Sequence, residues 1–449
     1  VESTVLRYRY RAYPDAKQRH ALSRLFGCVR VAANDAIAAR RAAYRAGQPY
    51  LKYSELSAAL TRSKTTPERA YLSEVSAVPL QQAIADVDRG YRNFFAGLTG
   101  ERQGPKMGPP KFRSRHDSRQ SACFTRNARF AVSRTGDREA VVRLPKIGPV
   151  KLVMSRPLPS TPASVTVIRE ADGRTYVSFV VEVTEDAAPA AGRVCGIDPG
   201  LSSFATIVTS DTATGQEAIA RIDTPKFLRS KARALARSQR ALSRKEKGSK
   251  NRGKAKQRVA VLHRKVRQTR LDHAHRQAAK IIAGHDVIAV EDLNITGMAR
   301  SNLARSVHDQ AMGQFLRLIT EKATRQGRTV VKVGRYYPST QTCSSCRQIT
   351  GPKGRGELRV RHWTCVECGV AHDRDVNAAR NILTEGLRLL ASASTQPTTP
   401  VDSRSLKTPA AHADGPPGLL ETGEDQLTTL ASVDEAGRTT GDRDDGVAA

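Results

Sequence analysis

The order of apolar and polar residues in the first quarter of the chain predicts a strand followed by helices. Residues 5–13 form a strand pattern that ends at Tyr13-Pro14, and apolar residues then recur at helical spacing between residues 22 and 33. A second apolar stripe, within residues 80–95, follows Pro79, whose missing N–H costs little in the first turn of a helix. We interpret both stripes as the faces by which two helices contact a hydrophobic core.

Short strands are expected after residues 104–110, a segment rich in glycine and proline that interrupts the helical pattern. The predicted strands are residues 140–144, 150–153, 165–169 and 176–183. Asp172-Gly173, between the last two strands, is typical of a tight hairpin turn. This part of the chain should therefore contain at least one β-hairpin.

A second pattern, of short apolar strands mixed with long helices, begins after a linker of small residues at 187–192. Strands are predicted at residues 194–197, 204–208, 287–290 and 329–333. Helices are predicted at residues 315–326 and 376–390, and a long polar helical hairpin at residues 227–282, broken near residues 248–253. This mixture predicts an α/β domain, which a small four-cysteine insertion splits.

The overall charge indicates an anionic partner. The chain has 449 residues, and its 74 Lys and Arg residues outnumber its 43 Asp and Glu residues, for a net charge of +31. A length of this kind suits about three domains, and a hydrophobic content of 39% excludes a wholly disordered protein. So large a positive surplus opposes compact folding unless an anion neutralises it. Nucleic acid is therefore the favoured partner, with a membrane surface as the second choice.

The sequence favours a cytoplasmic protein with an acidic tail. We find no uncharged apolar run long enough for a membrane helix, and residues 1–13 lack the apolar centre of a secretory signal, so we expect no membrane partner. Residues 391–449 carry ten acidic and four basic residues and show no apolar periodicity. We expect this tail to be disordered and to take no part in the chemistry.

Four of the seven cysteines are spaced as a metal site. Cys343-Ser-Ser-Cys346 and Cys365-Val-Glu-Cys368 are two pairs separated by eighteen residues, whereas the other three cysteines are scattered. This spacing is typical of a zinc ribbon with four thiolate ligands, which leaves no open position for water and is therefore structural. Free thiols also suit a reducing, cytoplasmic compartment. The alternative for the same residues is a redox-active or disulfide pair.

Three acidic residues lie where predicted strands end and a predicted helix begins. Asp198 and Glu291 each follow an apolar strand, and Asp375 lies at the start of the last helix. Clustered carboxylates repel one another unless divalent cations fill the cluster, and two Mg²⁺ ions about 3.5–4 Å apart stabilise the attacking and leaving oxygens of a phosphodiester. We therefore predict a site for two catalytic Mg²⁺ ions at these three residues. The alternative for each carboxylate by itself is a turn or a helix cap.

The predicted helical hairpin is strongly basic. Between residues 226 and 270 there are eighteen Lys and Arg residues and one acidic residue, Glu246. We predict that this hairpin binds a nucleic-acid backbone rather than bases, because aromatic residues are sparse in it. The candidate contacts are Arg264, Lys265, Arg267 and Arg270. The alternatives are a solvated face that aids solubility and phosphate contacts elsewhere, at Lys111, Arg113 and Arg115.

These motifs, in this order, resemble those of the TnpB family, the RNA-guided nucleases encoded by insertion-sequence transposons. The segments that carry the resemblance are Gly196-Ile-Asp-Pro-Gly200, Val290-Glu-Asp-Leu-Asn-Ile-Thr-Gly-Met298, Arg335-Tyr-Tyr-Pro-Ser-Thr-Gln-Thr-Cys-Ser-Ser-Cys346, Cys365-Val-Glu-Cys-Gly369 and His372-Asp-Arg-Asp-Val-Asn-Ala-Ala-Arg-Asn-Ile382. The resemblance covers nearly all of residues 4–388 and is less sharp in the N-terminal half. Arg347 departs from the pattern, because a glycine is more usual after the first cysteine pair.

The resemblance implies a multidomain α/β fold. It implies an N-terminal wedge domain, a β-barrel of residues 1–13 and 105–190, with a helical recognition insert at residues 14–104. It also implies a RuvC-like nuclease domain of the RNase H type, at residues 191–340 and 370–390. A zinc-ribbon insert that binds the target nucleic acid, residues 341–369, would interrupt that domain.

The resemblance further implies an activity. Proteins of this family carry a guide RNA and cleave target DNA beside a short transposon-associated motif, with catalytic acids that match Asp198, Glu291 and Asp375. Asp373 is the alternative third metal ligand, or else a helix cap. The alternative functions are a compact type V CRISPR effector, a guided DNA-binding repressor that does not cleave, and a zinc-ribbon DNA-binding protein without RNA. We expect the protein to act as a monomer.

Overall fold

The structure is a computed structural model that describes residues 3–102, 104–105, 107–184, 187–300, 304–353, 357 and 359–395. Among the described helices, none combines the length and the hydropathy needed to cross a membrane. The tail that we expected to be disordered lies outside the described residues from residue 396 onward. Its first five residues, 391–395, continue the last helix instead.

The first sheet is built from strands at both ends of the N-terminal half. Its seven strands pair antiparallel in the order β2-β6-β7-β1-β5-β4-β3. Their bounds are β1 Ser3–Tyr13, β2 Gln120–Thr125, β3 Ala131–Arg134, β4 Glu139–Leu144, β5 Gly148–Val153, β6 Ser164–Arg169 and β7 Thr175–Thr184. The predicted turn at Asp172-Gly173 is confirmed, because β6 and β7 pair across it and Gly173 has a φ of +79°.

Helices are inserted between β1 and β2. They are α1 Ala16–Arg45, α2 Tyr53–Ser63, the 3-10 helix η1 Pro67–Glu74 and α3 Ala77–Leu98. A capping box begins α1: the Asp15 carboxylate accepts a hydrogen bond from the N–H of Gln18, whose side chain accepts one from the N–H of Asp15. The apolar stripes predicted on α1 and α3 lie in one core with the sheet, which confirms both interpretations.

The second sheet carries two of the predicted acidic residues. Its five strands follow the order β10-β9-β8-β11-β12. Their bounds are β8 Arg193–Asp198, β9 Ser203–Asp211, β10 Glu217–Asp223, β11 Val287–Glu291 and β12 Thr329–Val333. The pairs from β8 to β10 are antiparallel and those from β8 to β12 are parallel. The four predicted strands are confirmed, and β10 was not predicted.

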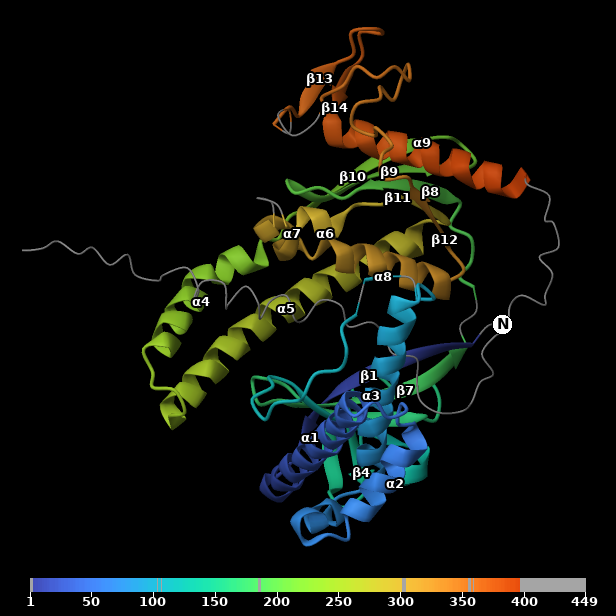
Figure 1. Cartoon of the computed structure of the whole chain (residues 1–449). Helices are drawn as coiled ribbons and strands as arrows, with labels where there is room; N and C mark the ends of the chain where they lie inside the picture. Colours follow the sequence, from blue (N-terminus) through green and yellow to red (C-terminus); the bar gives the residue numbers. More distant parts are fainter. Residues whose placement is uncertain are drawn as a thin grey trace, which may run out of the picture. The chain divides into compact units, whose positions relative to one another are not determined.

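Helices cover both faces of the second sheet (Figure 1). They are α4 Phe227–Ser243 and α5 Lys250–Gly284, which form the predicted hairpin, then α6 Ile295–Met298, α7 Ala304–Gln310, α8 Met312–Arg325 and α9 Arg374–Thr395. Neighbouring strand residues point to opposite faces: Cys195 and Ile288 contact the layer of α5 and α8, whereas Val194 and Ala289 contact α9. The predicted α/β architecture of this region is confirmed.

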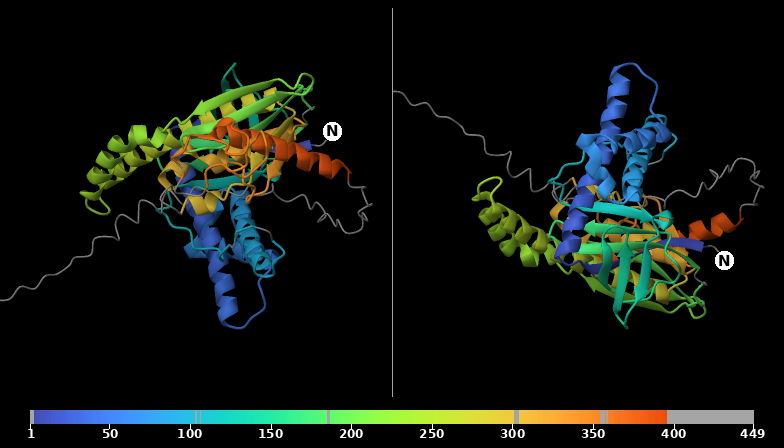
Figure 2. Two further views of the ribbon diagram at one scale, coloured as in Figure 1. Left: turned by 90° about the horizontal axis from the view of Figure 1, so that it is seen from above. Right: turned by 90° about the horizontal axis from the view of Figure 1, so that it is seen from below.

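Two glycines let α9 lie directly on the sheet. A Cβ atom at Gly196 would lie 2.2 Å from the carbonyl oxygen of Ala379, and one at Gly386 would lie 2.4 Å from the Cβ of Ala289. A larger side chain at either position would push α9 away from the strands. Seen from above, α9 lies across the strands of the sheet (Figure 2). The close contact places the first turns of α9 next to β8.

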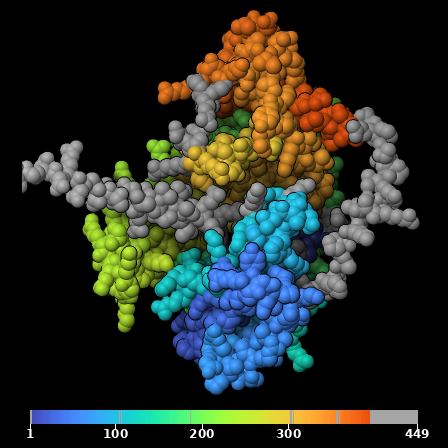
Figure 3. Space-filling model, in the orientation of Figure 1, coloured from blue at the N-terminus to red at the C-terminus, as the bar shows by residue number. Residues whose placement is uncertain are grey.

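The four-cysteine unit interrupts the chain between β12 and α9, as predicted. It includes the short antiparallel pair β13 His362–Thr364 and β14 Ala371–Asp373. In the space-filling view its residues gather in one body next to α9 (Figure 3). The last residue of β14 is followed directly by the first residue of α9.

Candidate functional site

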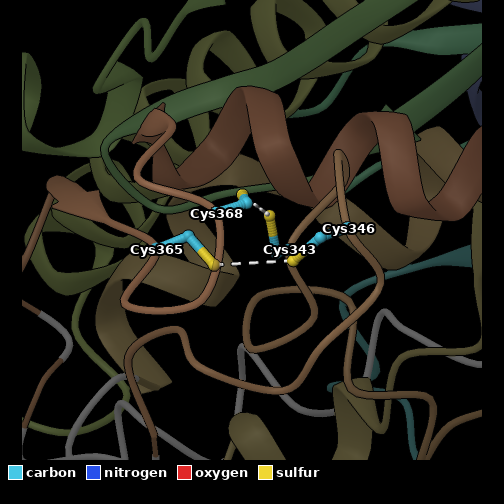
Figure 4. Close-up of side chains that lie close together, drawn as sticks. All are labelled: Cys343, Cys346, Cys365 and Cys368. Carbon is cyan, nitrogen blue, oxygen red and sulfur yellow. Dashed lines mark hydrogen bonds between the residues drawn. The ribbon is translucent and has the colours of Figure 1, made fainter.

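The four predicted cysteines converge on one point (Figure 4). Their sulfur atoms all lie within 4.8 Å of one another, with Sγ–Sγ distances of 3.7 Å from Cys343 to Cys368 and 3.6 Å from Cys346 to Cys365. Four sulfurs about 2.3 Å from a central zinc ion would be about 3.8 Å apart in a tetrahedron, so this cluster could hold that ion. All four thiols are free, and their sulfurs are well beyond the disulfide length of about 2.05 Å.

Two side chains from outside the cluster contact its sulfurs. The Thr350 hydroxyl lies 3.1 Å from Sγ of Cys365, and this hydrogen bond is the largest cause that lowers the pKa of that thiol, toward the thiolate form that a metal needs. The Nε2 atom of His372 lies 3.1 Å from Sγ of Cys343, and the imidazole ring lies 4.7 Å from the ring of Trp363. Such neighbours orient metal ligands.

The structure brings the three predicted carboxylates to one region at the edge of the second sheet. β8 and β11 are parallel neighbours in which Ile197 pairs with Val290. Asp198 and Glu291 follow directly, at the carboxyl ends of the two strands. Asp375 lies in the first turn of α9, which packs on β8. All three side chains are half-buried.

The charges of Asp375 and Glu291 act on Asp198. Burial, followed by the charges of Asp375 and Glu291, raises the pKa of Asp198 from its usual 3.8 to about 8. Burial also raises the pKa of Glu291 to about 7, with a smaller contribution from the charge of Asp292. A cation placed among the three carboxylates would relieve both effects.

Asp373 and Asp375 have different partners. Asp373 caps α9, because its Oδ1 accepts a hydrogen bond from the N–H of Val376 at 3.0 Å. Asp375 is the residue whose charge acts on Asp198, and its Oδ1 accepts a hydrogen bond from Nη1 of Arg361 at 3.2 Å. The geometry therefore favours Asp375 as the third carboxylate and Asp373 as the helix cap.

Two arginines that the sequence analysis did not single out lie near the carboxylates. The charges of Arg374 and Arg361 oppose the rise in the pKa of Asp198. Arg361 precedes β13, and only the pairing of β13 with β14 brings it next to α9, where its carbonyl accepts a hydrogen bond from the N–H of Arg374 at 2.8 Å. Within the described residues, the cysteines are the one group of three or more metal-ligating side chains whose ligand atoms all lie within 4.8 Å of one another. The three carboxylates are spread more widely than that.

We expect Asp198→Asn to stabilise the metal-free protein relative to the wild type, by an amount that increases with pH. In the unfolded chain this carboxyl has its ordinary pKa of 3.8, and in the folded protein the pKa is about 8. Between these values the folded protein keeps a proton that the unfolded chain has lost, so stability falls as the pH rises. Asparagine does not ionise and removes that loss. In Mg²⁺-free buffer the variant should melt several degrees above the wild type at pH 8, and close to it at pH 5.

Asp211→Asn is the matched control with the opposite sign. Hydrogen bonds from Thr214, whose N–H lies 2.9 Å from the carboxylate, and from the N–H of Ala213 lower the pKa of Asp211. The ionised form is therefore stabilised by folding, and the amide should lower the melting temperature at both pH values. A gain for Asp198→Asn that is equal at pH 5 and pH 8 would contradict the electrostatic account.

Two of the predicted phosphate contacts in α5 form ion pairs inside the protein. Arg264 and Arg270 are buried. The Nε atom of Arg264 lies 2.5 Å from a carboxylate oxygen of Asp172, and Nη2 of Arg270 lies 3.0 Å from one of Asp309. These ion pairs connect α5 to the β6–β7 turn and to α7. Arg264 and Arg270 therefore already have carboxylate partners inside the protein, and their contact with phosphate stays a prediction.

The other basic residues of the hairpin face solvent to a greater extent. Lys265 is exposed, and Arg267 is half-exposed with its Nη2 atom 3.6 Å from Glu170. α4 has no buried residue along its described length. Phosphate contacts by the hairpin are thus open to Lys265 and to the basic residues of α4.

The alternative basic segment is held in place by α1. The side chain of Asn34 makes two hydrogen bonds to the backbone of Arg113. Its Oδ1 accepts from the N–H of Arg113 at 2.8 Å, and its Nδ2 donates to the carbonyl of Arg113 at 3.0 Å. Arg113 is half-buried, while Lys111 and Arg115 are exposed. This segment presents two exposed cations on an ordered backbone.

Comparison with known proteins supplies the family. The OrfB_IS605 model, described as "Probable transposase", matches residues 178–302. A protein of Streptomyces pristinaespiralis named "Putative RNA-guided DNA endonuclease" is 37% identical over 389 residues, which cover 85% of this chain and 89% of that protein. The chain belongs to the TnpB family. InsQ of Escherichia coli K12 is 28% identical, over 86% of this chain and 93% of that protein. The TnpB-like protein L79 of Acanthamoeba polyphaga mimivirus is also 28% identical, over 53% of this chain and 46% of that protein.

Two further family models match this TnpB protein in part. A Cas12f1-like TNB domain matches residues 313–382, which include the four-cysteine unit. A helix-turn-helix domain matches residues 5–49, although here they form β1 and the single helix α1. A cryo-EM structure of a Cas12f1–sgRNA–target DNA complex aligns with 85% of this chain and 99% of that chain, at 15% identity and a TM-score of 0.33.

Proposed function

We propose that this TnpB protein is an RNA-guided, Mg²⁺-dependent DNA endonuclease that cleaves target DNA beside a short transposon-associated motif. The observation that carries the proposal is the convergence of Asp198, Glu291 and Asp375, where burial and mutual repulsion raise the pKa of Asp198. Relatives named as RNA-guided DNA endonucleases support the same activity. A net charge of +31 suits two anionic partners, a guide RNA and a target DNA.

The three carboxylates would hold the metal ions. Mg²⁺ prefers oxygen ligands, a few of them carboxylates, and a cation would offset both the burial and the repulsion that raise the pKa of Asp198. When bound, two Mg²⁺ ions would stabilise the attacking and leaving oxygens of the scissile phosphodiester. The chain's own part is to hold Asp198, Glu291 and Asp375 at the ends of β8 and β11 and the start of α9. Arg361 and Arg374 offset part of their negative charge.

We also propose that the cysteine cluster binds one structural zinc ion. The sulfur separations of 3.6 Å and 3.7 Å match the edges of a zinc–thiolate tetrahedron. The hydrogen bonds to Cys343 and Cys365 support the same role, because they orient the ligands. The ion would hold together the short segments between β12 and α9.

The domain layout belongs to the same proposal. The second sheet and its helices would be a RuvC-like domain of the RNase H type, residues 191–340 and 370–390, and residues 341–369 its target-binding insert. The insert supports this layout, because the chain leaves the sheet after β12 and returns to it through α9. The first sheet would be the wedge domain, and residues 14–104 would be the recognition insert. The sheet order supports this, because β1 precedes the helices but pairs with β5 and β7, which follow them.

The decisive experiment is to express the chain together with its own flanking DNA and purify the complex. We expect RNA to co-purify, so that the 260/280 nm absorbance ratio exceeds that of protein, and sequencing should assign this RNA to the flanking region. With the guide segment rewritten, only DNA that matches the new guide and carries the adjacent motif should be cleaved, and only with Mg²⁺. Bound RNA with matched binding but no cleavage would identify a repressor. Binding to DNA without any RNA would leave a zinc-ribbon DNA-binding protein.

A further inference from the structure

Two buried asparagines connect the first cysteine knuckle, residues 343–346, to α9. Asn377 and Asn381 lie four residues apart on α9 and are 1% and 0% exposed. The Oδ1 atom of Asn377 accepts a hydrogen bond from the N–H of Ser344, inside the knuckle, at 2.8 Å. The Nδ2 groups of both asparagines donate to the carbonyl of Thr342, at 2.8 Å and 2.6 Å. The knuckle is therefore bonded to α9 through its backbone.

The chain on either side of the knuckle is bonded to Asn381 as well. Its Nδ2 donates to the carbonyl of Ser339 at 2.8 Å, and its Oδ1 accepts from Nη1 of Arg347 at 3.3 Å. Arg347 has a φ of +67°, a conformation that favours glycine. Arginine stands there instead, and its guanidinium makes the hydrogen bond to Asn381. All the polar atoms of the Asn381 side chain are thus paired within the protein.

The asparagines and Asp375 lie on different sides of the same helix. A helix turns about 100° per residue, so Asn377 is about 200° around α9 from Asp375. The sheet fixes the helix from another direction, because Gly196 admits the backbone of Ala379 with no space to spare. A rotation of α9 that broke the asparagine bonds would therefore move Asp375 away from Asp198.

We propose that Asn377 and Asn381 are positioning residues, which use the folded cysteine knuckle to hold Asp375 in place for the catalytic metal ions. The proposal rests on the proposed function, since it assigns the asparagines to the same Mg²⁺ site. The four-cysteine unit would then have two separate roles. One is to bind nucleic acid, and the other is to hold Asp375 in position. A merely structural role of the asparagines would affect the cysteine unit and leave the metal response unchanged.

The test is Asn381→Asp, which keeps the size of the side chain and replaces the donors to Ser339 and Thr342 by an oxygen. Arg388→Gln is the matched control, since it changes the charge by the same amount on the same helix, where Arg388 pairs with Glu385. Both proteins should retain about one zinc ion per chain. Mn²⁺ affinity, measured by electron paramagnetic resonance on the protein without nucleic acid, should fall about 10- to 100-fold in Asn381→Asp alone. The Mg²⁺ concentration for half-maximal cleavage should rise in parallel, and excess Mg²⁺ should recover part of the rate.

Unchanged Mn²⁺ affinity with zinc retained would overturn the proposal. So would loss of zinc from Asn381→Asp, because the asparagines would then serve the cysteine unit itself. If that variant does not fold, Arg347→Gln removes one donor to Asn381 and should shift the Mn²⁺ affinity in the same direction by a smaller factor. Because Mn²⁺ binding needs no DNA, a shift in a protein that never cleaves would refute the endonuclease proposal and leave this one standing.

Discussion

Replacement of Asp198, Glu291 or Asp375 by alanine should abolish cleavage of a matched target while binding of the guide and the target stays nearly unchanged. The remaining two carboxylates would not organise two metal ions. Metal ions supply several kcal/mol of transition-state stabilisation, and each 1.4 kcal/mol is about tenfold in rate, so we expect a loss of about a thousandfold or more. Removal of an acid also removes repulsion against phosphate, so binding should not weaken. Cleavage of a labelled duplex and a gel-shift titration measure the two effects separately.

Asp373→Ala is the control for this series. Asp373 caps α9, and its Oδ2 lies 2.7 Å from Nη2 of Arg221, whereas Asp375 is among the main causes of the raised pKa of Asp198. Loss of a cap costs about 1 kcal/mol of stability, so we expect a milder loss of cleavage than in the three alanine variants. Full cleavage by Asp198→Ala in Mg²⁺ would contradict the assignment of the catalytic acids.

Local patterns were sufficient for several elements that bury a periodic face. The strands β8 and β11 are short apolar runs, and α1, α3 and α8 each carry a stripe that the structure buries. Two of the unpredicted elements bury little: α2 buries Leu56 and Leu60, and β10 has no buried residue. β10 exists because it pairs with β9 along its length at the edge of the sheet. That pairing depends on a partner strand and leaves no periodic signal in the sequence of β10.

At the candidate sites, too, features set by the local sequence could be predicted, and features that depend on a distant partner could not. Asp198 and Glu291 could be placed together because each ends an apolar strand, and parallel strands end at the same edge. The spacing of the cysteines was likewise sufficient to predict that the four sulfurs lie together. The roles of the hairpin arginines could not be predicted, because the partner of Arg264 is Asp172, 92 residues earlier, and local charge density does not distinguish a buried ion pair from an exposed cation. Arg361 was missed for the same reason.

Loss of the zinc ion should have the second large effect. Cys365→Ser removes one of four thiolates, and zinc binding to small cysteine-based units contributes about 10–16 kcal/mol of folding free energy at pH 7, so the unit should unfold locally. Metal analysis should fall from about one zinc ion per chain to nearly none. Trp363 is the one tryptophan of the chain, and its ring lies 4.7 Å from that of His372, so its emission should shift as this packing is lost.

Cleavage should fall with the zinc, by about 100-fold or more, because the unit both contributes Arg361 next to Asp375 and holds the start of α9 through its asparagines. Cys123→Ser is the matched control, since Cys123 lies on β2 of the first sheet and the substitution is the same. It should keep its zinc, its tryptophan emission and its cleavage. A zinc-free Cys365→Ser protein that cleaves its target at the wild-type rate would contradict both the structural role of the ion and its connection to the catalytic carboxylates. Zinc loss with an unchanged Mn²⁺ affinity would contradict that connection alone, because unfolding of the knuckle should release Asp375 from its position.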